Sequence, residues 1–99
     1  MHIISRKTLV KFCEQPQYQD AEQPLKAWYT EAKKAHWRTP ADVKQKYRSA
    51  SIIANHRVVF NIAGNKYRLV VKIHYNTGVL YIRFIGTHAE YDKIDAETI

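Results

Sequence analysis

The spacing of apolar residues changes once along this chain of 99 residues, and that change limits the folds it can adopt. In the first half, apolar side chains recur at helical spacing, most clearly at Leu25, Trp28, Tyr29 and Ala32. After Ser49-Ala50-Ser51 the spacing changes to the two-residue alternation of β-strands. The order predicts an α+β fold in which two or three N-terminal helices pack on one face of a C-terminal antiparallel β-meander.

Local signals predict where the first two helices begin and end. Ser5 is expected at the N-cap of a first helix that ends near Pro16. Asp20, with Gln23 as its capping-box partner, is expected to start a second helix that runs to about Trp37. His2-Ile3-Ile4, ahead of both helices, is expected to form a short strand.

A third helix start is predicted at Thr39-Pro40-Ala41-Asp42, which combines a Thr cap, Pro at the first helical position and an acid three residues after the cap. The following short helix is expected to carry Val43 and Tyr47 on one side. Further strands are expected over 57–62, 66–75 and 79–85, separated by turns at 63–65 and 76–78. Gly86 is expected to break the last strand, and residues 87–95 to form a loop with a terminal helical turn.

Alternation assigns the strand residues to two sheet faces. The face toward the helices is expected to carry the apolar set Tyr67, Leu69, Val71, Ile73, Leu80, Ile82 and Phe84. The open face is expected to carry Arg68, Val70, Lys72, His74, Val79, Tyr81, Arg83 and Ile85. Arg68 and Arg83 therefore lie on adjacent strands of one face, where two guanidinium groups repel unless an anion lies between them.

The distribution of charge supports an anionic partner for that face. No acidic residue occurs between Asp42 and Glu90, whereas the same stretch holds eight Lys or Arg, and the whole chain has a net charge of +7 and a pI near 9.6. Such a basic surface favours a nucleic acid. No spacing of His, Cys, Asp or Glu predicts a metal cluster, so neither a metal nor another cofactor is expected.

Length and composition predict one domain, residues 1–99, with a single core. The single cysteine, Cys13, fits a reducing compartment and is expected to pack as a small hydrophobe. No apolar run is long enough for a signal peptide or a membrane span, so a cytoplasmic protein without a membrane partner is expected.

Three segments together resemble the HigB-type toxins of bacterial type II toxin–antitoxin systems, members of the RelE-like mRNA interferase superfamily. The segments are Phe60-Asn61-Ile62-Ala63-Gly64-Asn65-Lys66-Tyr67-Arg68-Leu69, Tyr81-Ile82-Arg83, and Thr87-His88-Ala89-Glu90-Tyr91-Asp92. The resemblance extends over the whole chain and includes the opening Met-His-Ile-Ile. It implies a RelE-like fold and ribosome-dependent cleavage of translated mRNA in the A site of the 70S ribosome. It also implies restraint by a cognate HigA-like antitoxin of the helix-turn-helix class, with DNA contacted only through the antitoxin complex.

The resemblance also implies roles for particular residues. Arg68 matches the arginine that contacts the scissile phosphate, and His88 and Tyr91 match a late general acid or base and a nearby aromatic residue. Arg83 is expected to assist Arg68 at the phosphate, and the lysines that RelE uses have no clear match here. The residues expected to contact RNA elsewhere are Lys66, Lys72, Arg57, Lys46 and Arg48.

The chemistry expected of these residues needs no metal, because the 2′-hydroxyl of RNA is itself a nucleophile. An arginine fork suits a phosphate, and a histidine can give or take a proton near neutral pH. Two rival interpretations stay open. A non-catalytic basic RNA-binding module needs the same surface but not His88, and a DNA-binding regulator is disfavoured because the basic residues lie mainly on strands.

Overall fold

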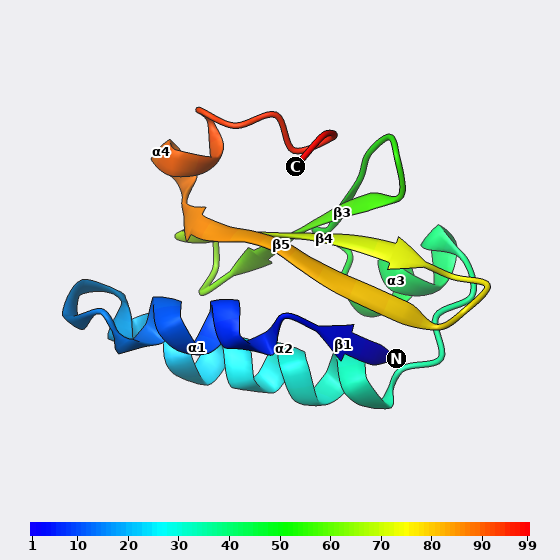
Figure 1. Cartoon of the computed structure of the whole chain (residues 1–99), viewed down its shortest axis with the longest axis horizontal. Helices are drawn as coiled ribbons and strands as arrows, with labels where there is room; N and C mark the ends of the chain where they lie inside the picture. Colours follow the sequence, from blue (N-terminus) through cyan, green and yellow to red (C-terminus); the bar gives the residue numbers. More distant parts are fainter.

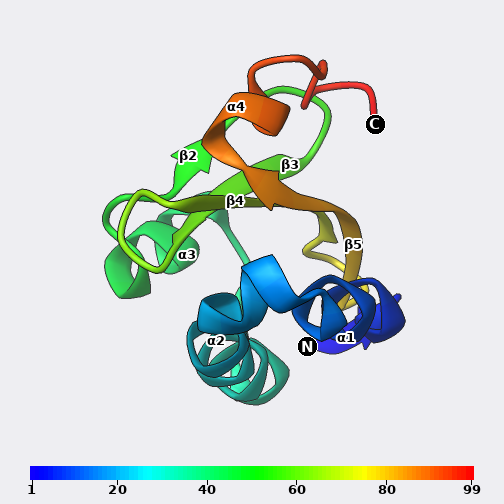
Figure 2. The ribbon, with the colours of Figure 1, turned by 90° about the vertical axis from the view of Figure 1, so that its left-hand side faces the viewer.

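The structure is a computed structural model that describes all 99 residues. A sheet lies between a layer formed by α1 and α2 and a cover formed by α4 and the chain that follows it (Figures 1 and 2). The elements in chain order are β1 His2–Ile4, α1 Arg6–Glu14, the 3₁₀ helix η1 Pro16–Ala21, α2 Glu22–Lys34, α3 Pro40–Lys46, β2 Ser51–Ile52, β3 Arg57–Ile62, β4 Tyr67–His74, β5 Val79–Thr87 and α4 His88–Tyr91.

The sheet has five strands in the order β1-β5-β4-β3-β2. The pairs β2–β3, β3–β4 and β4–β5 are antiparallel, as expected of a meander. The short N-terminal strand β1 joins the other edge parallel to β5, so the sheet is mixed. The α+β class with helices before the meander is therefore confirmed, and β1 adds a parallel edge strand to the sheet beside β5. No helix combines the length and the apolar character that crossing a lipid bilayer requires.

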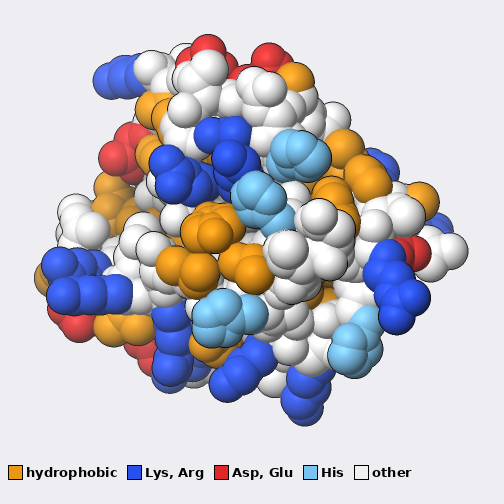
Figure 3. Space-filling view, turned by 45° about the vertical axis from the view of Figure 1, so that its right-hand side comes forward, with side chains coloured by type: hydrophobic (Ala, Val, Ile, Leu, Met, Phe, Trp, Pro, Cys, Tyr) orange, Lys and Arg blue, Asp and Glu red, His pale blue; other side chains and the backbone are white.

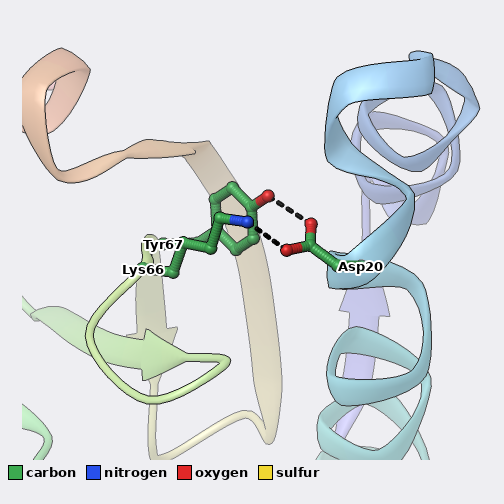
Figure 4. Close-up of polar contacts among 3 residues, drawn as sticks. All are labelled: Asp20, Lys66 and Tyr67. Atoms are coloured by element: carbon green, nitrogen blue, oxygen red, sulfur yellow. Dashed lines mark hydrogen bonds and ion pairs between the residues drawn. The ribbon is translucent and has the colours of Figure 1, made fainter.

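The apolar stripe of the second helix faces the core, since Leu25, Trp28 and Ala32 are buried. The start predicted for this helix at Asp20 is wrong: Asp20 lies in η1, and α2 begins at Glu22 without a side-chain cap. The Asp20 carboxylate instead accepts hydrogen bonds from the Lys66 ammonium and the Tyr67 hydroxyl at the start of β4 (Figure 4). A tertiary contact thus replaces the local cap.

The other helix boundaries follow the local signals more closely. Ser5 occupies the N-cap position of α1, but its φ of 75° is left-handed and its side chain caps nothing. The capping box at α3 is confirmed, because Thr39 Oγ1 accepts from the Asp42 N–H at 3.3 Å and the Asp42 carboxylate accepts from the Thr39 N–H at 3.2 Å. The end of α2 lies at Lys34, short of the expected Trp37.

The core lies between the sheet and the helices, as the alternation of β4 predicts. Tyr67, Leu69, Val71 and Ile73 are all 0% exposed. They belong to one cluster of 19 buried residues that also takes in α1, α2 and Val43 of α3. Burial of this apolar area is the main source of stability for a chain of this length.

A β-bulge at Arg83 reverses part of the face assignment in β5. Val70 pairs with Phe84 and Val71 pairs with Ile82, so Arg83 is an extra residue without a partner. Beyond the bulge, Phe84 packs with residues of the face away from the helices, and Ile85 packs in the main core. The sheet faces predicted for Phe84 and Ile85 are therefore wrong, because each side chain lies on the opposite face from the one expected.

The sheet face opposite α1 and α2, called the α4 face below, is only partly open. The side chains of Val59, Val70 and Ala96 form a second small buried cluster there, with Tyr91 packed against it. The chain after α4 thus covers the middle of a sheet face that the strand alternation predicted to be open. The expected break at Gly86 is also wrong, because β5 continues to Thr87.

Candidate functional site

Arg68 lies near the start of β4 on the α4 face, between Asn61 of β3 and Gly86 of β5. One of its guanidinium nitrogens, Nη1, donates to the Asn65 carbonyl at a long 3.4 Å. Neither Arg68 nor Arg83 forms an ion pair with a carboxylate. Because a guanidinium has five N–H donors, most of the donors of Arg68 remain available to a ligand.

The bulge brings Arg83 to the same face. Ile82 and Ile85 both face the core, so the two residues between them, Arg83 and Phe84, project from the α4 face. Arg83 is exposed, and it lies three residues before Gly86, the β5 partner of Arg68. The two arginines therefore lie on adjacent strands of one face, where both long side chains can reach toward a phosphate bound between them.

Gly86, directly opposite Arg68, leaves room for the side chains above it. A Cβ atom at this position would lie 2.6 Å from Cζ of Phe84 and 3.1 Å from Oε1 of Glu90. The Phe84 ring and the Glu90 carboxylate therefore occupy the space that a larger residue would fill. Both groups border the point at which the chain leaves the sheet and enters α4.

A capping box fixes that entry. The Glu90 carboxylate accepts a hydrogen bond from the Thr87 N–H at 2.8 Å, and Thr87 Oγ1 accepts one from the Glu90 N–H at 3.2 Å. His88 is the first residue of the helix that this box starts. The capping box thus sets how α4, which begins at His88, leaves the end of β5. Figure 1 shows α4 directly after β5.

His88 has an acidic partner one helical turn later. Its Nδ1 lies 3.4 Å from Oδ2 of Asp92, and both side chains are more than half exposed. A carboxylate at Nδ1 favours the proton on that nitrogen and leaves Nε2 free for proton exchange with a substrate. Tyr91 is half-buried beside the cluster of Val59, Val70 and Ala96, so its ring has a fixed support.

Arg68, Arg83, His88 and Tyr91 are therefore brought to one face by β4, the bulge and α4. They make no hydrogen bonds to one another. The arrangement offers two unpaired guanidinium groups, an exposed imidazole with an acidic partner, and an aromatic ring. Chemically it can bind a phosphate and exchange a proton beside it.

The basic residues expected to contact RNA separate into two groups. Three have partners within the protein. The guanidinium of Arg57 is buried and donates to the main-chain oxygens of Ile99 and Asn55, so most of its donors already have partners within the protein. Lys46 pairs with Glu31 of α2 at 2.9 Å, on the helix side of the sheet.

Lys66 is the third residue of that group, through its ion pair with Asp20 (Figure 4). Hydrogen bonds from Lys66 and Tyr67 lower the pKa of the Asp20 carboxyl, and the same carboxylate raises the pKa of the Lys66 ammonium. Lys72 and Arg48 form no ion pair. Only Lys72 projects from the α4 face, since Arg48 follows α3 on the other side of the sheet.

A hollow in the surface lies away from these residues. It is a groove of about 610 Å³ between α1 and α2, with Leu9, Cys13, Leu25 and Tyr29 in its lining. Burial raises the pKa of the Cys13 thiol, which disfavours the reactive thiolate. The groove therefore adds no group to the site on the α4 face.

Comparison with known proteins gives an independent view of the chain. Residues 21–94 match the family described as HigB toxin, the RelE-like toxic component of a toxin-antitoxin system. The chain is 30% identical over 98 residues to the mRNA interferase toxin HigB of Escherichia coli (strain K12), covering 97% of this chain and 92% of that protein. It is similar to the same extent to the mRNA interferases HigB of Escherichia coli O157:H7 and Shigella flexneri.

Proposed function

The chain belongs to the HigB family of RelE-like toxins of toxin–antitoxin systems, and from this premise we propose that it inhibits growth by cutting mRNA on the ribosome. The observation that carries the proposal is that Arg68 and His88 lie on one face and that no carboxylate forms an ion pair with the arginine. The proposal treats residues 1–99 as one catalytic domain.

The reaction proposed is attack of a ribose 2′-oxygen on the adjacent phosphorus. The new O2′–P bond forms as the P–O5′ bond breaks, which leaves a 2′,3′-cyclic phosphate on one fragment and a 5′-hydroxyl on the other. Arg68 and Arg83 neutralise the phosphoryl oxygens, on which negative charge grows during the reaction. Because RNA supplies its own nucleophile, the scheme needs no metal-bound water.

His88 exchanges a proton with one of the two reacting oxygens, through Nε2. Such a group typically contributes roughly 10²–10⁴-fold in rate. Asp92 holds Nδ1 and so orients the ring, and the capping residue Glu90 holds the helix that carries both. Tyr91 stacks on a base or orients the phosphate from its apolar support.

The ribosome enters the proposal because the attacking oxygen, the phosphorus and the departing oxygen must lie in line. Orientation of this kind can lower a barrier by several kcal/mol, and a ribosome that bends the mRNA in its A site supplies it. Family membership implies a neutralising antitoxin partner. We propose that this antitoxin is HigA-like with a helix-turn-helix, and that DNA is contacted only through the complex.

The test is cleavage of mRNA by purified toxin in a translating extract, mapped by primer extension. Arg68→Ala and His88→Ala should each lower cleavage by at least 100-fold while their unfolding midpoints stay near that of the wild type. Arg38→Ala and His36→Ala are matched controls, because both residues are exposed and have no expected role in binding RNA. Full cleavage by a folded His88→Ala protein would favour the non-catalytic binding module, with the nuclease supplied by another protein.

A second test addresses the absence of a metal step. A ribosome–mRNA–toxin complex is formed first, and a brief pulse of EDTA is applied before the ribosomal subunits separate. Cleavage should continue during that interval. Immediate loss of cleavage while the ribosomes remain intact would contradict the proposed chemistry.

A further inference from the structure

A group of aromatic rings lies on the α4 face at the end of β4 farthest from Arg68. The imidazole rings of His56 and His74 are stacked, with centroids 5.9 Å apart and planes 14° apart. The ring of Tyr81 meets His74 edge-on at a centroid distance of 5.5 Å. Lys72, the β4 partner of Tyr81, projects from the same face beside these rings.

The group is accessible and carries no acid. His56 is exposed, and His74, Tyr81 and Lys72 are half-buried. None of the four takes part in an ion pair. Figure 3 shows histidine side chains gathered on this end of the molecule, next to Lys and Arg side chains and a hydrophobic patch, with no Asp or Glu among them.

The loop before β3 holds the outer ring in place. Asn55 and His56 have positive φ values of 61° and 63°, a conformation that most residues avoid and that the surroundings must enforce. Those surroundings are hydrogen bonds from Asn55 to the Glu97 carbonyl and from Arg57 to Asn55 and Ile99. The His56 ring is therefore presented by a tethered loop.

Flat rings with an adjacent cation and no acid match one ligand chemistry, an unpaired nucleobase with its phosphate. Stacking on aromatic side chains is tolerant of sequence, and an ammonium group binds the neighbouring phosphate. His74 lies six residues from Arg68 along β4, or about 20 Å at the rise of a strand. A nucleotide bound at Arg68 cannot reach that far, so the two places would contact different nucleotides.

We propose that His56, His74, Tyr81 and Lys72 form a second subsite for single-stranded RNA, separate from the place of cleavage. The proposal rests on the function proposed above, since it extends the RNA path along the α4 face. The RNA is either the mRNA being cut or an unpaired segment of ribosomal RNA. Both sources share the same chemistry, and the experiment separates them.

The first arm measures binding of the full chain, carrying His88→Ala to prevent cleavage, to unpaired RNA oligonucleotides of increasing length by fluorescence anisotropy. The affinity of this protein should rise once the RNA is long enough to span about 20 Å. Adding His74→Ala or Tyr81→Ala should remove that rise and weaken binding of the longer RNA roughly tenfold. Tyr81→Phe keeps the ring and should bind nearly as well, and His36→Ala is the control for loss of an exposed histidine.

The second arm measures binding of the same proteins to vacant ribosomes. A loss confined to ribosomes assigns the subsite to ribosomal RNA, and a loss with oligonucleotides assigns it to mRNA. Unchanged binding in both arms by folded variants would overturn the subsite. It would also be overturned if the substitutions weakened binding to the antitoxin and left both kinds of RNA binding unchanged. Failure of the proposed function would appear separately, as absence of cleavage by a protein that still binds RNA through these rings.

Discussion

Gly86→Ala offers a quantitative test of how the site is packed. The backbone at Gly86 does not require glycine for its φ, so the cost of alanine arises from contacts alone. The added Cβ would lie 2.6 Å from Cζ of Phe84 and 3.1 Å from Oε1 of Glu90. Carbon atoms prefer ~3.5–4.0 Å, so the ring must retreat by about 1 Å from its half-buried position.

Forced shifts of this size in packed regions typically cost about 1–3 kcal/mol of unfolding free energy. We therefore expect Gly86→Ala to destabilise the protein by that amount. In a Phe84→Leu background the obstructing end of the ring is absent, and the cost of Gly86→Ala should fall by about 1 kcal/mol, a coupling typical of side chains in contact. Urea unfolding measures all four proteins, each made in an Arg68→Ala background chosen to limit toxicity to the host cells. A cost that is negligible, or equal with and without the ring, would refute the placement of Phe84 over Gly86.

Three further substitutions test other contacts. Glu90→Ala removes the capping box of α4 and should lower both stability, by ~1 kcal/mol in thermal unfolding, and the rate of mRNA cleavage. Glu90→Gln keeps an acceptor at the cap and should retain most of the stability and most of the cleavage. Asp20→Asn removes a carboxyl whose pKa the Lys66 ammonium lowers in the folded state. In urea titrations the wild type should therefore be more stable than the variant at pH 7, and this advantage should disappear below about pH 4, where the carboxyl becomes protonated. Arg57→Met removes the hydrogen bonds to Ile99 and should speed hydrogen exchange in residues 92–99 while leaving the affinity for short RNA unchanged. A selective loss of RNA binding would instead identify Arg57 as an RNA contact.

The alternation of β4 could be predicted because one of its faces is purely apolar. Tyr67, Leu69, Val71 and Ile73 leave only one way to place the strand, and the helical stripe of α2 is equally clear. The bulge at Arg83 could not be predicted in this way. Phe84 and Ile85 are both apolar, so the sequence fits either face at the point where the alternation reverses.

Other errors arose because side chains found distant partners. Asp20 has the sequence pattern of a cap, but Lys66 and Tyr67, more than 40 residues later, take its carboxylate. Composition likewise counts Arg57 among the basic residues without showing that its guanidinium is buried. Charge patterns predict which stretch is basic, whereas the fold decides which cations remain free.

The segment around His88 also carries a helix-start signal in the sequence. Thr87 and Glu90 have the same cap-to-acid spacing that correctly predicted the start of α3. Asp92 follows His88 by four residues, the spacing of neighbours on a helix face. These two spacings identify Glu90 and Asp92 as supports for His88 from the sequence alone. The position of Phe84 on the α4 face cannot be predicted in this way, because it depends on the bulge at Arg83.

The most direct test of the central claim is the rate of cleavage of an mRNA with a single 2′-deoxyribose at the nucleotide that supplies the attacking oxygen. Ribosomes are programmed with this mRNA and with its all-ribose counterpart, and the fragments are mapped by primer extension. We predict that the deoxy mRNA loses cleavage at that position alone. We also predict that the fragments of the all-ribose mRNA carry 2′,3′-cyclic phosphate and 5′-hydroxyl ends. Undiminished cleavage of the deoxy substrate, or fragments with 5′-phosphate ends, would contradict attack by the 2′-oxygen at the Arg68–His88 site.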